Sequence, residues 1–81
     1  MADIFKGYKG AALNLLKERN MRVWGDIEIN TTRGDFRGIL LPRSEFDDDQ
    51  HIVVKLQSGY NIGIAVDSVI SMKEVGYKEA H

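Results

Sequence analysis

The sequence contains no cysteine and only one proline among its 81 residues. Without cysteine the chain has no disulfide bond, no thiolate zinc site and no thiol nucleophile, and nothing indicates an oxidising compartment. No segment approaches the roughly 20 apolar residues that span a bilayer, and the N-terminus has no apolar signal core. We therefore expect a cytoplasmic protein without membrane association.

An excess of either charge is also lacking, because 11 Lys and Arg residues against 12 Asp and Glu residues give a formal net charge of -1. This balance provides no overall attraction to nucleic acid or anionic membranes, so any partner must be recognised locally. A chain of 81 residues is long enough for one small core but too short for an asparaginase-type or ligase-type catalytic fold. We expect one domain over residues 1–75 and a tail, or the start of a linker, over 76–81.

Apolar residues at helical spacing predict an N-terminal helix over residues 3–19. Asp3 is its expected N-cap, and Asn20 is expected to end it in a left-handed conformation. Gly7 and Gly10 each lower helix stability by about 1 kcal/mol relative to alanine, so the helix needs a surface to lie on. The residues expected on its buried face are Ile4, Phe5, Tyr8, Ala12, Leu15 and Leu16.

Beyond Arg22 the apolar period changes to that of β-strands. Alternation predicts strands near residues 26–30, 36–41, 51–56, 60–65 and 69–75, with a tight turn at 66–68. Pro42, which cannot donate to a ladder, suits the end of the second strand. Five short, bent, antiparallel strands close most economically into a small barrel without exposed edges, with the helix at one opening. The residues expected inside are Ile52, Val54, Leu56, Ile62 and Ile64, with Tyr60 on the same face as the last two.

No group of residues in the sequence has the spacing of a catalytic or metal site. Asp26 and Glu28 fall on the exposed face of a strand, and no serine has the context of a nucleophile. The acidic residues from Glu45 to Asp49, with His51 beside them, lack the ligand spacing and the turn glycine of a calcium loop. We expect a solvated acidic loop, no metal and no cofactor.

Basic and aromatic residues form one candidate surface of the kind that small barrels use to bind single-stranded nucleic acid. Its members are Arg37, Arg43, Lys55 and Trp24. The favoured alternative is an ordinary charged surface, in which Arg37 and Lys55 pair with Glu28 across strands.

The turn Ser58-Gly59-Tyr60-Asn61 has residues that a simple hairpin does not require. In the structural interpretation Gly59 supplies a positive φ, Tyr60 packs over the barrel, and Asn61 hydrogen-bonds the turn backbone. In the functional interpretation the same turn docks on a neighbouring domain or on a partner protein.

The chain contains two distinctive segments, His51-Ile52-Val53-Val54-Lys55-Leu56 and Gly59-Tyr60-Asn61-Ile62-Gly63-Ile64, preceded by Gly38-Ile39-Leu40-Leu41-Pro42. With them, essentially the whole chain resembles the N-terminal domain of the D subunit (GatD) of archaeal glutamyl-tRNA(Gln) amidotransferases. The resemblance implies a small Src-homology-3-like or Sm-like barrel that precedes an asparaginase-like domain. It also implies a parent complex that converts Glu-tRNA(Gln) to Gln-tRNA(Gln) with glutamine and ATP.

The family's Thr-Gly-Gly-Thr-type motif is absent, so no catalytic or ATP-binding residue is carried over. The resemblance implies a noncatalytic assembly and positioning domain. Its implied partners are the asparaginase-like domain of the same polypeptide and the E subunit of the amidotransferase, with tRNA involved only indirectly. We expect the reading frame to continue beyond His81 into that domain. The alternative is a freestanding small-barrel binding module for RNA or a protein, which salt-dependent RNA affinity would favour.

Overall fold

The computed structural model describes residues 4–43 and 48–77. Within them lie one α-helix, five strands and a single 3₁₀ turn: α1 (Gly10–Glu18), β1 (Gly25–Thr31), β2 (Gly34–Leu40), β3 (His51–Leu56), β4 (Asn61–Ala65), η1 (Val66–Ser68) and β5 (Val69–Tyr77). The predicted fold class, mainly β with five antiparallel strands and an N-terminal helix, is confirmed.

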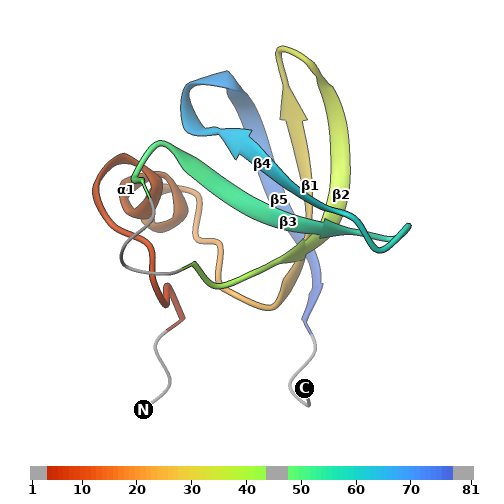
Figure 1. Cartoon of the computed structure of the whole chain (residues 1–81), viewed down its shortest axis with the longest axis horizontal. Helices are drawn as coiled ribbons and strands as arrows, with labels where there is room; N and C mark the ends of the chain where they lie inside the picture. The colour runs from red at the N-terminus through yellow and green to blue at the C-terminus, as the bar shows by residue number, and fades with distance from the viewer. Residues whose placement is uncertain (1–3, 44–47, 78–81) are drawn as a thin grey trace.

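The strands form one curved antiparallel sheet in the order β4-β3-β2-β1-β5. Helix α1 lies at one end of the sheet, beside η1 and the start of β3 (Figure 1). Among the described residues β4 and β5 share no ladder, because η1 redirects the chain so that β5 pairs with β1. The barrel is therefore open between β4 and β5, and two sheet edges remain where full closure was expected.

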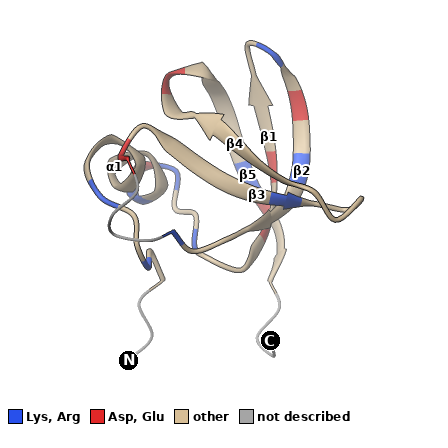
Figure 2. Cartoon of the chain, viewed as in Figure 1, with Lys and Arg blue, Asp and Glu red and all other residues tan. Residues whose placement is uncertain are grey.

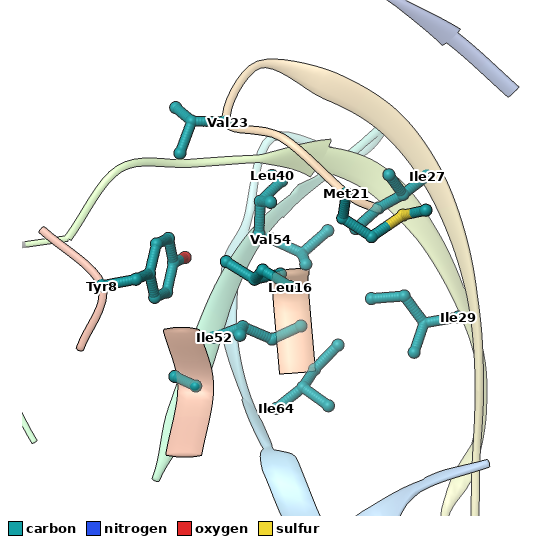
Figure 3. Close-up of a cluster of buried hydrophobic side chains, with 11 residues drawn as sticks. Tyr8, Leu16, Met21, Val23, Ile27, Ile29, Leu40, Ile52, Val54 and Ile64 are labelled. Atoms are coloured by element: carbon teal, nitrogen blue, oxygen red, sulfur yellow. The ribbon is translucent and has the colours of Figure 1, made fainter. Parts of the chain in front are cut away.

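Alternating strand residues build the core against the helix. Ile27 and Ile29 of β1, Ile52 and Val54 of β3, and Leu16 of α1 are fully buried and point toward one another (Figure 3). The expected register of β3 and β4 is confirmed, since the other predicted interior residues are buried or partly buried in this cluster and the outward Lys55 is exposed. Those interior residues are Leu56, Ile62 and Ile64.

Helix α1 begins at Gly10, so the prediction of a helix from residue 3 is wrong at its start. Gly7 and Gly10 have φ angles of 84° and 56°, and this left-handed backbone interrupts a right-handed helix. The preceding residues form a turn in which the N–H of Tyr8 donates to the carbonyl of Phe5 at 2.9 Å. The expected cap, Asp3, lies outside the described residues.

The end of α1 follows the prediction. Asn20 has a φ of 60°, and the N–H of Met21 donates to the carbonyl of Leu16 at 2.9 Å. This bond satisfies a carbonyl of the last helical turn, as a left-handed cap does.

Strand β5 is longer than its apolar pattern indicated. Gly76 and Tyr77 pair with Asp26 and Gly25 of β1, so β5 includes two residues that the sequence placed in the tail. At the other strands the bounds agree to within a few residues, and β3 matches at both ends.

Tyr8 completes the ladder between β2 and β3 from outside the sheet. Its hydroxyl donates to the carbonyl of Leu41 at 2.7 Å and accepts from the N–H of Val53 at 3.1 Å. The N–H of Leu41 donates directly to the carbonyl of Val53 at 2.9 Å. The hydroxyl thus replaces the second bond of an antiparallel residue pair. Burial raises the pKa of Tyr8 from 10.0 to about 12.

We expect Ile52→Ala to lower the free energy of unfolding by about 2 to 5 kcal/mol, because the core cannot fully close over the lost side chain. Lys55→Ala, on the outward face of the same strand, is the matched control and should change it by less than about 0.5 kcal/mol. Urea denaturation of both variants measures the difference. A small effect for Ile52→Ala would mean that the register is shifted by one residue.

We expect Tyr8→Phe to lower the free energy of unfolding by about 1 to 3 kcal/mol, because the carbonyl of Leu41 and the N–H of Val53 each lose their bond to the buried hydroxyl. The folded pKa of Tyr8, about 12, lies above its ordinary value of 10.0. The stability from the neutral hydroxyl is therefore complete below that ordinary value and is lost as the pH rises through the folded pKa. Urea unfolding across this alkaline range should show a steeper loss for the parent chain than for Tyr8→Phe. Parallel pH profiles would contradict the assignment.

Candidate functional site

The turn between β3 and β4 presents its side chains to solvent. Ser58, Gly59, Tyr60 and Asn61 are all exposed. Two backbone bonds hold the turn, since the N–H of Gly59 donates to the carbonyl of Leu56 at 2.9 Å, and the N–H of Leu56 donates to the carbonyl of Tyr60 at 2.8 Å. Gly59 has a φ of 98°, which a residue with a side chain adopts only with strain. The turn thus presents four exposed residues on a hydrogen-bonded backbone.

Tyr60 does not pack over the barrel as the structural interpretation predicted. Strand β4 begins at Asn61, and Tyr60 is 75% exposed. Its parity with Ile62 and Ile64 suggested an inward ring, but the core cluster ends before the turn, where the hairpin extends beyond the sheet. Within the described part of the chain, the side chain of Asn61 makes no hydrogen bond to the turn backbone. An aromatic ring and an amide are thus left at the surface.

Arg37 and Lys55, two members of the basic and aromatic candidate surface, lie on the same outward face of neighbouring strands. The register pairs Ile39 with Lys55, and Arg37 is the next residue of β2 on that face. Arg37 lies opposite Glu28 in the ladder, but its guanidinium bonds to Asp26 at 3.2 Å. This hydrogen bond raises the pKa of Arg37. The expected pairing with Glu28 is therefore replaced by one with Asp26.

Arg43 and Trp24 occupy other parts of the molecule. The side chain of Arg43 is only 11% exposed and lies 3.7 Å from a carboxylate oxygen of Asp48. Trp24 is 36% exposed in the connection between α1 and β1, where its backbone N–H donates to the carbonyl of Leu40 at 2.7 Å. Along the described ribbon, the positions of Lys and Arg are interspersed with those of Asp and Glu in both the helix and the sheet (Figure 2).

The described part of the acidic loop contains a local carboxylate–imidazole pair. Asp48 accepts from the N–H of Gln50 at 2.8 Å and lies 3.1 Å from Nδ1 of His51. The backbone bond above all, and then the imidazole, lower the pKa of Asp48. His51 is thus partly paired, as predicted, whereas Glu45 and Asp47 lie outside the described residues. Within the described ranges, residues 4–43 and 48–77, no three His, Asp or Glu side chains lie closely enough together to hold a metal ion.

One cluster that the sequence did not reveal joins the start of β1 to the end of β5. The guanidinium of Arg22 bonds both carboxylate oxygens of Glu74, at 2.9 and 3.3 Å, and lies 3.6 Å from the centre of the Tyr77 ring. Arg22 and Glu74 are 52 positions apart, and no spacing rule connects residues that only the β1–β5 pairing brings together. A second missed feature is a pocket beside β4, lined by Phe36, Ile62 and Arg33 among others.

Residues 21–75 match the family described as the GatD N-terminal domain. This segment is more than half of the 81-residue chain. The chain belongs to this family. It is 40% identical over 74 residues, 90% of its length, to the D subunit of the glutamyl-tRNA(Gln) amidotransferase of Methanopyrus kandleri. It is 41% identical over 75 residues, 93% of its length, to the corresponding polypeptide of Saccharolobus solfataricus.

The resemblance stated from the sequence is therefore confirmed. The chain spans 16% of the length of the Methanopyrus kandleri relative and 17% of the Saccharolobus solfataricus relative. The GatD N-terminal domain thus corresponds to a small part of those relatives. Within its described residues no helix has the length and apolar character needed to cross a membrane.

We expect Gly59→Val to destabilise the domain by more than about 1 kcal/mol, because its φ of 98° is costly for a β-branched residue. Tyr60→Phe and Asn61→Ala, at exposed positions beside it, should each change the free energy of unfolding by less than about 0.5 kcal/mol. Thermal unfolding of the three variants separates the two effects. Large losses for Tyr60→Phe and Asn61→Ala, in proportion to any assembly defect, would show that the turn serves only the hairpin.

Proposed function

We propose that this GatD N-terminal domain is an assembly and positioning domain of the D subunit of a glutamyl-tRNA(Gln) amidotransferase and carries out no reaction step itself. The main support is the solvent-exposed, hydrogen-bonded turn of Ser58, Gly59, Tyr60 and Asn61, in which Tyr60 is 75% exposed. Tyrosine is enriched at protein interfaces, where its ring buries a large area at low entropic cost.

The partners in this proposal are the asparaginase-like remainder of the same polypeptide and the E subunit of the amidotransferase. The parent complex converts Glu-tRNA(Gln) to Gln-tRNA(Gln) with glutamine and ATP in the cytoplasm. Its tRNA contacts this domain only indirectly. The family membership supports this role.

The distribution of charge supports protein assembly over nucleic-acid binding. Arg37 is paired with Asp26, and Arg43 is largely covered beside Asp48. Binding to a nucleic-acid backbone requires several cations that are free to replace counterions. Along the strands, the positions of Lys and Arg are interspersed with those of Asp and Glu, which does not favour such binding (Figure 2).

The proposal is tested in a chimera in which this domain replaces the matching 74-residue segment of the Methanopyrus kandleri relative. Tyr60→Ala should weaken association with the partner protein about tenfold or more, as loss of an aromatic interface anchor does. Asn61→Ala should weaken it less. Ile70→Ala, which truncates an exposed apolar residue of β5, is the matched control and should assemble normally. Affinity measurements and transamidation assays report both effects.

Normal assembly and transamidation by the Tyr60 and Asn61 variants would contradict the docking role of the turn. Salt-dependent binding of RNA by the 81-residue chain, lost on Arg37→Ala and Lys55→Ala, would favour the RNA-binding module instead. Catalytic turnover by the chain alone would contradict the noncatalytic assignment.

A further inference from the structure

Strand β4 has an open backbone edge. The N–H of Leu56 donates to the carbonyl of Tyr60 at 2.8 Å, and the N–H of Val66 donates to the carbonyl of Gln50 at 2.8 Å. In this antiparallel register the even-numbered residues of β4 exchange hydrogen bonds with β3. The odd-numbered residues therefore direct their N–H and C=O groups to the opposite side. They are Asn61, Gly63 and Ala65.

Gly63 lies at the centre of this edge. The carbonyl of Ala65 accepts from the hydroxyl of Ser68 at 2.7 Å, whereas no described residue bonds the outward groups of Gly63. Apart from its two chain neighbours, no described residue lies within 4 Å of the place where a Cβ of Gly63 would stand, so an alanine fits at this position. The outward N–H and C=O of Gly63 are available to pair with another backbone.

The other edge strand, β5, is protected in ways that β4 is not. Its register with β1 shifts twice, which leaves Val75 and Ile70 without a Cα partner, and Lys73 is exposed on it. Bulges and lysines are devices that prevent pairing at sheet edges. Strand β4, with the sequence Asn-Ile-Gly-Ile-Ala, has no charge and no proline, and its pairing with β3 is regular. Of the two edges, β4 is the one suited to accept a further strand.

A pocket of about 320 Å³ opens beside this edge. Phe36, Ile62 and Ile64 provide its apolar wall, and Arg33 and His51 are its titratable residues. In an added strand, residues opposite Ile62 and Ile64 would point to the same side as those isoleucines. One alternating side chain of the added strand would therefore enter the pocket.

The charge of the residues around the pocket indicates which kind of polypeptide segment fits beside β4. Arg33 is exposed at the turn between β1 and β2, and no acidic residue is among the described residues that line the pocket. A second copy of this chain would bring β4, which has no carboxylate, or the bulged β5. A segment of another polypeptide with an apolar residue and a nearby carboxylate complements the apolar wall and Arg33.

We propose that the free edge of β4 binds an extended segment of a partner polypeptide by strand addition, with an apolar side chain in the pocket and a carboxylate beside Arg33. Backbone hydrogen bonds to Asn61 and Gly63 supply affinity, and the pocket supplies selectivity. This binding site shares only the backbone of Asn61 with the turn proposed for assembly and does not depend on that role.

The probes are acetylated seven-residue peptides of sequence Thr-Val-Thr-X-Thr-Glu-Thr, in which X is Val, Leu, Ile or Phe. We expect at least one to shift the amide NMR signals of Gly63 and Ala65 in the ¹⁵N-labelled chain. At about 90% saturation, hydrogen exchange at Gly63 should slow about tenfold, because only the free tenth exchanges. Replacing Glu by Lys in the peptide should weaken binding about two- to fivefold, and Arg33→Glu should reverse this preference.

Gly63→Pro should abolish binding, because proline removes the outward N–H, whereas Gly63→Ala, which keeps it, is the matched control and should bind. N-methylation of the peptide at the residue opposite Gly63 tests the same hydrogen bonds without altering the protein. Failure of all four peptides to shift Gly63, or undiminished binding by the N-methylated peptides, would overturn the proposal. Concentration-dependent protection of Gly63 in the chain alone would also overturn it, since a second copy would then occupy the edge.

Discussion

The hydroxyl of Tyr8 holds the fold together at the point where β2 and β3 separate. It bridges the carbonyl of Leu41 and the N–H of Val53, a pair whose other bond is direct. The next residue, Pro42, cannot donate to a ladder, so the strands diverge there. One buried group therefore satisfies the end of the ladder and attaches the N-terminal turn to the sheet. That attachment places α1, and with it Leu16, over the open end of the core (Figure 3).

The strands were predictable because a buried face imposes period two on the sequence. Only one register places Ile27, Ile29, Ile52 and Val54 together on the inner face, and the structure has that register, with all four side chains fully buried. The start of the helix was not predictable from period alone. Tyr8 has the spacing of a helical core residue and is indeed buried, but it reaches the core from a turn that the positive φ of Gly7 allows. Periodicity detects burial and does not report the backbone conformation that achieves it.

The candidate surfaces were predictable only in part, for a related reason. The turn from Ser58 to Asn61 was located by its glycine, a local signal. The exposure of Tyr60 depends on where the core ends relative to the hairpin, which alternation does not state. Arg37 bonds Asp26 and not Glu28, the residue opposite it in the ladder, and this depends on how the long side chain of Arg37 extends across the strands. The barrel stays open because η1 leads the chain from β4 to β5 without pairing the two strands, and this opening leaves the edge at Gly63 free.

The two ends of the described chain lie at one end of β1. The carbonyl of Ile4 accepts from the N–H of Val23, and Tyr77 pairs with Gly25, so both ends of the described chain lie beside the start of β1. The pocket includes Thr31, at the far end of the same strand. Six residue steps of a strand separate these ends by about 20 Å. The described ends and the pocket thus lie near opposite ends of β1.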